Sequence, residues 1–456
     1  MAGKRKTNSA GSTNKFRGDV LRVLGVLKVA TADQIQRIGA PHLTYRHTDK
    51  DTPSKQKQAR TASHTGALSD MRKHGLAETG GTTTGGESLR NLTTKGLEAA
   101  SYALGRPVTE MGSTARGAGA SGATHPMTVN ETVIAMLRPK PDLARMTKDP
   151  DEVRAAAQAA IDTPDGIGTI ASYWTEVPLP ATGTWNAPGK GGAQADIVLT
   201  APQDQVPLLF IEADNCHETA EELADKLEKY ARFFRRKVKD TDGKERPMWR
   251  TRWTVPEAAE APHPPVLLVF NRLGDRNPNR TIPRLAELTR HLWAGQRFED
   301  HHLYDGKIPI IATGLRNLRE HGPDGEVFLR FGRDRMQCLR EAIGNPRREA
   351  ADVRRRAEYE AHAREYKEQL RRAAEQQKAE REARRPACTG CGTKFTDDRW
   401  KAAAAYPTPG PRWHPTLCDG CEGQAVKAAS RAQDEHQEQD QIPGQKPGSW
   451  FSRLRT

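Results

Sequence analysis

Apolar residues recur at strand and helix spacings through the middle of the chain. Two apolar runs of strand length are joined by a polar turn with two prolines, and an amphipathic helix pattern follows them. The pattern predicts helices at 125–137 and 220–234, and strands at 170–177, 197–199, 208–211 and 265–270. A helix, three strands, a helix and a further strand indicate a layered α/β domain, which we assign to residues 125–345.

The preceding residues, 15–104, carry a different order of elements. Helix patterns at 16–27, 31–38 and 59–74 are followed by a two-stranded hairpin that ends at Gly96. This is the order of a winged helix-turn-helix domain, whose third helix enters the major groove of DNA. We predict base contacts from the start of that helix and phosphate contacts from nearby basic residues. The predicted DNA-binding residues are Arg60, Thr61, Ser63, His64, Arg72, Lys73 and Arg90. A winged helix that serves only packing or dimerisation is the alternative.

Three further segments are distinguished by composition. Residues 105–124 are rich in Gly, Ala and Ser, which predicts a flexible linker between the two domains. Residues 346–385 are dense in Arg, Glu, Lys and Ala without a lasting leucine heptad, which predicts a solvated helical arm and not a coiled coil. Residues 426–456 form a polar tail.

Residues 386–425 contain two pairs of cysteines. Cys388 and Cys391 form one pair, and Cys418 and Cys421 form the other, with 26 residues between the pairs. Four thiolates at this spacing predict a tetrahedral Zn²⁺ knuckle, and so small a module needs the metal in order to fold. Because four sulfurs fill the coordination sphere, the predicted zinc is structural.

The charge favours a polyanionic partner. The 456 residues carry a formal net charge of +13, and the mean hydropathy is -0.78. Such a balance suits DNA, although ribosomal and membrane-surface proteins share it. No apolar run approaches the roughly 20 residues of a membrane helix, and paired cysteines that bind metal suit a reducing compartment. We therefore expect a cytoplasmic protein without a membrane partner.

Three carboxylates interrupt the predicted strands. Asp196 opens one strand, while Glu212 and Asp214 close the next and share one of its faces. Acids that converge at strand ends predict a site for a hard cation of the Mg²⁺ type. In the helix that follows, Lys226 borders the apolar stripe and Tyr230 lies one turn further on. The alternative is that the acids only cap their strands.

The run Asp196 … Glu212-Ala213-Asp214, followed by Lys226 and Tyr230, resembles the core of PD-(D/E)XK nucleases. Over about residues 15–275 the chain resembles the replication-relaxation family of plasmid and conjugative-element proteins, which combines a winged helix with such a core. The chain departs from the nuclease pattern at Asp214, where a lysine is usual. In some nucleases of this class the lysine lies in the next helix, which would make Lys226 its substitute.

The resemblance implies phosphodiester cleavage with Mg²⁺ or Mn²⁺ held by Asp196 and Glu212. By the same resemblance the Ala213 carbonyl would be a third ligand, and Asp214 would hold a second metal or orient Lys226. The Lys226 ammonium would stabilise the charge that develops on the phosphate. Tyr230 would pack or contact phosphate and would not act as a nucleophile.

Other residues near this motif are open to two interpretations. Glu131, in the helix before the first strand, would lend a further acid or would be a surface glutamate. His125 and Asn130 would be capping or core-facing polar residues. The segment with Trp249, Arg250, Arg252 and Trp253 would grip DNA, or would pack on the sheet as a lid.

Together these features predict a DNA-binding protein of a mobile element. Its core would nick or cleave DNA during plasmid replication, relaxation or transfer, with other replication or transfer proteins as further candidate partners. The alternatives are an inactive core that serves as a DNA-binding initiator or accessory factor, and a transcriptional regulator that acts through its winged helix alone.

Overall fold

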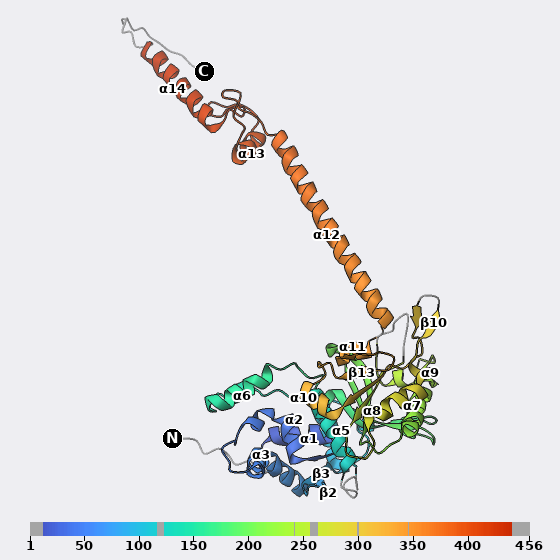
Figure 1. The fold of residues 1–456 in the computed structure, drawn as a ribbon. Helices are drawn as coiled ribbons and strands as arrows, with labels where there is room; N and C mark the ends of the chain where they lie inside the picture. Colours follow the sequence, from blue (N-terminus) through green and yellow to red (C-terminus); the bar gives the residue numbers. More distant parts are fainter. Residues whose placement is uncertain are drawn as a thin grey trace, which may run out of the picture. The chain divides into compact units, whose positions relative to one another are not determined.

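The computed structural model describes residues 12–115, 123–240, 242–255, 263–298, 301–344 and 346–439. The chain divides into two compact units, Met1–Ala351 and Asp352–Thr456 (Figure 1). Both are mixtures of helices with strands or isolated bridges, and the first contains all the named strands. Among the described residues, no helix is both long and apolar enough to cross a membrane.

Helices surround a small antiparallel sheet in the N-terminal part of the first unit. The helices are α1 (Asn14–Leu27), α2 (Ala32–Gly39), α3 (Pro53–Lys73) and α4 (Thr94–Leu104), and the strands are β1 (Val29–Thr31), β2 (Ala77–Thr82) and β3 (Ser88–Leu92). The sheet order is β1-β3-β2. The Thr31 side chain and Gln34 form the expected capping box at the start of α2. Helix α3 begins before the predicted residue 59, because Thr52 caps it.

A seven-stranded mixed sheet forms the centre of the first unit. Its strands are β4 (Tyr173–Leu179), β5 (Ala193–Ala201), β6 (Val206–Asp214), β9 (Val266–Phe270), β12 (Ile310–Gly314), β13 (Phe328–Arg330) and β14 (Met336–Gln337). The order is β14-β13-β12-β9-β6-β5-β4. Strands β4, β5 and β6 are antiparallel neighbours, whereas β6, β9 and β12 run parallel. Parallel neighbours need a crossover connection, and α7 supplies it between β6 and β9.

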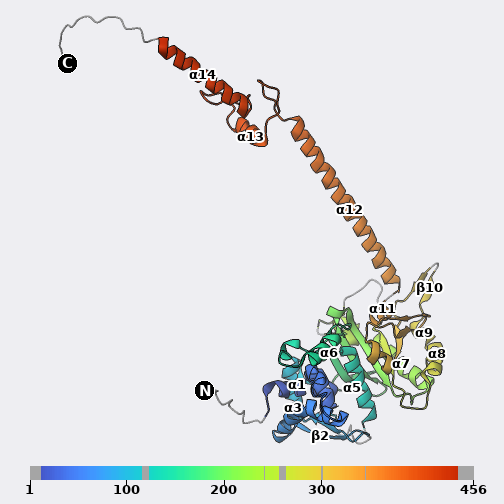
Figure 2. The same cartoon turned by 60° about the vertical axis from the view of Figure 1, so that its left-hand side comes forward.

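Helices cover both faces of this sheet (Figure 1, Figure 2). The main ones are α5 (Thr124–Leu137), α7 (Ala220–Arg235), α8 (Pro278–Leu288) and α10 (Leu315–His321). Alternation along β6 sends Leu209 and Ile211 into one apolar core with α5 and α10, and Phe210 into the other with α7 and α8. The layered α/β arrangement predicted from the strand patterns is therefore present.

Shorter elements complete the first unit. They are the helices α6 (Asp151–Ile161), α9 (Arg290–Trp293) and α11 (Leu339–Ile343), and the hairpins of β7 (Lys237–Lys239) with β8 (Glu245–Pro247) and β10 (Gln296–Phe298) with β11 (His301–Leu303).

Part of the predicted linker is packed and not free. Residues 108–110 form a short 3-10 helix, and the Met111 side chain is 1% exposed. The Lys28 ammonium donates a hydrogen bond to the Met111 carbonyl, which fastens this segment to the end of α1. Residues 116–122 of the predicted linker lie outside the described part of the chain.

The two tryptophans of the segment after β8 are core residues. Trp249 and Trp253 are each 4% exposed, and the Trp253 ring packs edge-on against Phe210 and Trp185. These buried rings favour the packed lid over a surface on which bases stack.

The second unit contains all of α12 (Pro346–Ala383) after Ala351, together with α13 (Asp397–Ala405) and α14 (Asp419–Gln439). Figure 2 shows α12 as one unbroken helix. Its described side chains are exposed, and opposite charges pair along it, as between Arg372 and Glu368. Such pairs stabilise a solvated helix, as the composition predicted.

Candidate functional site

An open cleft of about 910 Å³ lies beside β5 and α7. Its wall includes His125 of α5, Asp196 of β5, and Lys226 and Lys229 of α7, together with a glycine-rich loop at 188–192. Cations and carboxylates thus meet along one cleft, on elements that the apolar pattern had predicted.

Glu212 lies buried behind this cleft. Its side chain is 2% exposed, and the Lys226 Nζ lies 2.6 Å from its Oε2. The Tyr230 hydroxyl donates a hydrogen bond to Oε1. Burial, reinforced by the charge of Asp196, raises the pKa of Glu212 well above its usual value. Lys226 and Tyr230, one turn apart on α7, therefore both contact the Glu212 carboxylate. Any effect of Tyr230 on the site is exerted through Glu212.

Asp196 reaches the same place from the neighbouring strand. Its Oδ2 accepts a hydrogen bond from the Ala213 N–H at 2.8 Å, and its Oδ1 lies 2.9 Å from the His125 Nε2. Burial raises the pKa of Asp196, but the bond with His125 and its charge help to bring the net pKa below the usual value. The same bond raises the pKa of His125. Sequence reasoning missed His125 as a site residue, although its place at the start of the helix before β4 was a signal.

Asp214 holds a loop. Its Oδ1 accepts a hydrogen bond from the Cys216 N–H at 3.0 Å, at the left-handed turn where Cys216 has φ of 62°. Burial raises the pKa of Asp214. Its described hydrogen bond goes to loop backbone, and the Lys226 charge acts on it without a direct contact. Its predicted roles beside Lys226 or a second metal stay predictions.

The carboxylates of Asp196, Glu212 and Asp214 do not lie close enough together to form a three-ligand cation site. Within the described ranges, the four cysteines of the second unit are the only group of three or more Cys, His, Asp or Glu whose ligand atoms all lie within 4.8 Å of one another. Asp196 and Glu212 are still oxygen donors on paired strands, linked through the Ala213 amide. Two carboxylates supply the oxygen donors that a hard cation takes, although His125, the Ala213 amide, Tyr230 and Lys226 contact all four of their oxygens in this structure.

The structure separates the residues predicted for base contact into buried and exposed ones. His64 is 0% exposed, packs edge-on against Phe16 and lies 3.6 Å from Asp19. Thr61 is 7% exposed, and its hydroxyl donates to a backbone carbonyl of its own helix. Arg60 pairs with Asp33 of α2 at 2.7 Å. His64 and Thr61 are thus core residues, which leaves them no surface for a base contact.

The exposed face of α3 is made of other residues. Ser63, Arg72 and Lys73 are exposed, as expected, and Arg90 on β3 is half-buried. At helical spacing the outward face is small, polar or basic, with Lys55, Gln58, Ala62, Gly66, Ser69 and Lys73. Thr61 and His64 lie at helical spacing from the buried Leu68 and Met71, so the predicted set included residues of the inward side of α3.

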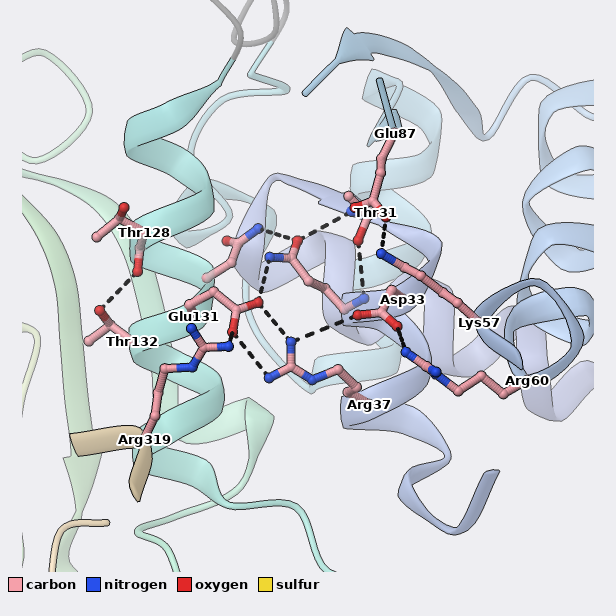
Figure 3. A network of polar contacts seen from close by, with 12 residues as sticks. Thr31, Asp33, Arg37, Lys57, Arg60, Glu87, Thr128, Glu131, Thr132 and Arg319 are labelled. Carbon is pink, nitrogen blue, oxygen red and sulfur yellow. Dashed lines mark hydrogen bonds and ion pairs between the residues drawn. The ribbon is translucent and has the colours of Figure 1, made fainter. Parts of the chain in front are cut away.

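Glu131 faces the N-terminal helices and not the cleft. Its carboxylate pairs with Arg37 of α2 at 2.7 Å and with Arg319 of α10 at 3.3 Å. Figure 3 shows how Asp33 extends this network to Arg60 of α3. The proposed role of Glu131 as a further acid of the cleft is therefore wrong, because this carboxylate binds α2 and α10 to α5.

The four cysteines of the second unit gather as their spacing predicted. The Sγ atoms of Cys391 and Cys418 are 3.7 Å apart, close to the roughly 3.8 Å that a tetrahedron with Zn–S bonds of about 2.3 Å requires. The Cys418 N–H donates to the Cys388 Sγ, which lowers the pKa of Cys388 to about 6. Arg399 of α13 pairs with Glu422 of α14 at 2.6 Å and closes the module. This group could hold a structural zinc ion.

Comparison with known proteins gives one match. Residues 21–245 match the model of a protein family described as Replication-relaxation. No curated protein and no solved structure matches the chain. The matched residues run from α1 to β8, and so include Asp196, Glu212, Lys226 and the helices that pack on α5. Through these residues, the chain belongs to the replication-relaxation family.

Proposed function

We propose that this is a DNA-binding protein of a mobile element, acting in replication, relaxation or transfer, and that its cleft nicks DNA with the help of Mg²⁺ or Mn²⁺. The observation that carries the proposal is the meeting of Asp196, Glu212 and Lys226. They come from two paired strands and one helix, with the Lys226 Nζ 2.6 Å from Glu212. An ammonium next to two carboxylates beside an open cleft is suited to a phosphodiester substrate.

The order of elements supports a PD-(D/E)XK-like core. Helix α5 precedes the antiparallel strands β4, β5 and β6, and α7 then leads to β9, parallel to β6. The resemblance based on the Asp196 … Glu212-Ala213-Asp214 motif implies this order. Asp196 and Glu212 lie at corresponding places on its second and third strands.

The side chains around the two acids would have separate roles in cleavage. A divalent cation, when held by Asp196 and Glu212, would polarise the phosphate and lower the pKa of a bound water. Lys226, released from Glu212, would stabilise the negative charge that develops on the phosphate. Tyr230 keeps Glu212 oriented, and His125 keeps Asp196 oriented. Lys229, on the same side of α7, would contact the DNA backbone.

DNA binding is proposed for the exposed face of α3. Its small and basic residues allow close approach to a groove, and the hairpin of β2 and β3 follows it as a wing would. The ion-pair network around Glu131 joins this region to α5, whose start carries His125. Helix α3 and the cleft are therefore parts of one compact unit that could engage the same DNA.

Incubation of the full-length protein with supercoiled plasmid and Mg²⁺ tests the proposal. We expect open circles from the wild type and none from Asp196→Ala or Glu212→Ala. Lys226→Met should lower the nicking rate by about 10²–10³-fold. The matched control Lys229→Met, which alters a lysine of the same helix and cleft, should lower it less than tenfold.

One observation favours a second function. Lys226 already pairs with Glu212, and the described residues contain no group of three carboxylates close enough to share a cation. The core could therefore serve only to bind DNA. In that case the wild type would retard plasmid DNA in a gel but leave it supercoiled at every concentration of Mg²⁺ or Mn²⁺, and the nicking proposal would fail.

A further inference from the structure

A second pocket, of about 450 Å³, lies between the end of α1 and β4. Three cations line it, namely Lys28, Arg106 and Arg252, together with Trp174 and Trp185. The Arg106 guanidinium lies 3.8 Å from the centre of the Trp174 ring, and the Arg252 guanidinium lies 5.3 Å from that of Trp185. The pocket thus has walls in which arginines stack on tryptophans.

Backbone carbonyls hold the three cations. Lys28 donates to the Gly25 carbonyl at 2.9 Å, Arg106 to the Tyr173 carbonyl at 2.8 Å and Arg252 to the Glu110 carbonyl at 3.2 Å. Within the described residues, none of the three forms an ion pair at 4.0 Å or less. Burial lowers the pKa of Lys28 to about 8 and that of Arg106 to about 10, although Glu176 and Glu110 act in the opposite direction. The neighbouring arginines add to the lowering. An anion in the pocket would relieve this repulsion.

Two acids, Glu110 and Glu176, also line the pocket and offset part of these positive charges. Burial raises the pKa of Glu176, and the Lys28 charge opposes this shift. The Glu110 charge acts on Arg106 and Arg252, and the Glu110 carbonyl accepts a hydrogen bond from Arg252. With three cations and two acids in its lining, the pocket still has an excess of positive charge for an anionic ligand.

The backbone around the pocket is strained at two places. Lys28 has φ of 67° and Glu176, within β4, has φ of 53°, and both line the pocket. Residues other than glycine adopt this region at a cost, and such residues cluster where a ligand is held. The Arg252 Nε and the Trp174 Nε1, both donors, have no hydrogen-bond acceptor in the structure. Each of these features is independent of the charges.

We propose that this pocket binds a nucleotide, with its phosphate on Lys28, Arg106 and Arg252 and its base against the tryptophan walls. Phosphate is an anion that accepts several charge-assisted hydrogen bonds at once, and an arginine-backed indole is a surface on which any base can stack. The volume lies within the range of small-ligand sites. This site goes beyond the proposed cleavage and does not depend on it.

The position of the pocket indicates where its nucleotide would come from. Pro178 lines both this pocket and the cleft that contains Asp196. A strand that leaves the cleft could therefore place one nucleotide in the pocket, while a free nucleotide would satisfy the same contacts. A nucleotide of a DNA strand and a free nucleotide would make the same contacts in the pocket. Only if the site takes a strand should a longer oligonucleotide bind more tightly than a mononucleotide.

Calorimetry on the zinc-loaded full-length protein without added Mg²⁺ or Mn²⁺, with thymidine monophosphate as the probe, tests the site. We expect saturable binding, weakened at least tenfold by Arg252→Gln. The control Arg250→Gln changes an arginine two residues away that stacks on Trp249 and does not line the pocket, and should change the affinity less than twofold. A second variant, Lys28→Met, should also weaken binding, and circular dichroism identifies any variant that fails to fold.

Further measurements identify the ligand and distinguish this site from the cleft. Asp196→Ala should bind the probe as the wild type does, even if that variant and the wild type alike fail to nick DNA. Tighter binding of hexathymidylate than of the monophosphate identifies a strand as the source, and equal binding identifies a free nucleotide. The inference is overturned if the monophosphate does not bind, if Arg252→Gln binds it normally, or if inorganic phosphate binds equally well.

Discussion

Replacement of Lys226 by methionine tests whether the buried Glu212 carboxylate depends on its ammonium partner. The substitution keeps the length of the side chain and removes only the charge that lies 2.6 Å from Glu212 Oε2. Removal of one partner from a buried ion pair costs about 3–5 kcal/mol. Lys226 is 27% exposed, and Glu212 can take up a proton, so we expect a loss of about 2–3 kcal/mol in the free energy of unfolding at pH 8.

The loss should depend on pH in a defined direction. Without Lys226, the pKa of Glu212 in the folded state rises further above its unfolded value of about 4.3. The folded variant then binds a proton that the unfolded chain has released. The contribution of Glu212 to the stability of the variant is therefore fully present below pH ~4.3 and is lost as the pH rises towards the folded pKa, by at most about 1.4 kcal/mol per pH unit.

Urea unfolding followed by tryptophan fluorescence at pH 5 and pH 8 measures this loss. The control Lys229→Met should change the stability by less than about 1 kcal/mol at both pH values. The double variant Lys226→Met/Glu212→Gln should recover at least half of the loss at pH 8, because no charge is left unpaired. Our reasoning about the pair is refuted if Lys226→Met is as stable as Lys229→Met at pH 8, or if its loss is the same at both pH values.

Three other predictions concern the zinc module, His125 and α3. Cys418→Ser should lower the native mass by one zinc ion and make the module sensitive to protease, and a wild type that carries no zinc would contradict this. The hydrogen bond to Asp196 raises the pKa of His125, so Mn²⁺ affinity should rise with pH as His125 loses its proton, and His125→Gln should flatten that rise. Ser69→Glu on the exposed face of α3 should weaken DNA binding at least tenfold, whereas His64→Ala should lower stability by about 1–3 kcal/mol with little effect on DNA affinity.

Local patterns were enough to predict many of the elements. The apolar run at 208–211 became the buried centre of β6, and Thr31 with Gln34 formed the expected capping box. The cysteine spacing predicted a cluster that the structure contains, because two short loops bring four thiols together without help from the rest of the fold.

Side-chain direction and long-range partners could not be predicted in the same way. His64 has a polar side chain but lies on the inward side of α3, where it packs against Phe16 and Asp19 of α1. Glu131 meets Arg37, which is far away in the sequence. The partner of Asp196 is His125, 71 residues earlier. Each of these contacts depends on how α2, α3 and α5 pack, which periodicity in one helix does not specify.

Binding of Mn²⁺ to the zinc-loaded protein in the absence of DNA tests most directly whether Asp196 and Glu212 form a cation site. Titration calorimetry should show one Mn²⁺ per chain for the wild type, at least tenfold weaker binding for Asp196→Ala and Glu212→Ala, and little change for Lys229→Met. If the wild type binds no Mn²⁺, or if the two alanine variants bind it as tightly, the cleft is not a metal site and the core only grips DNA.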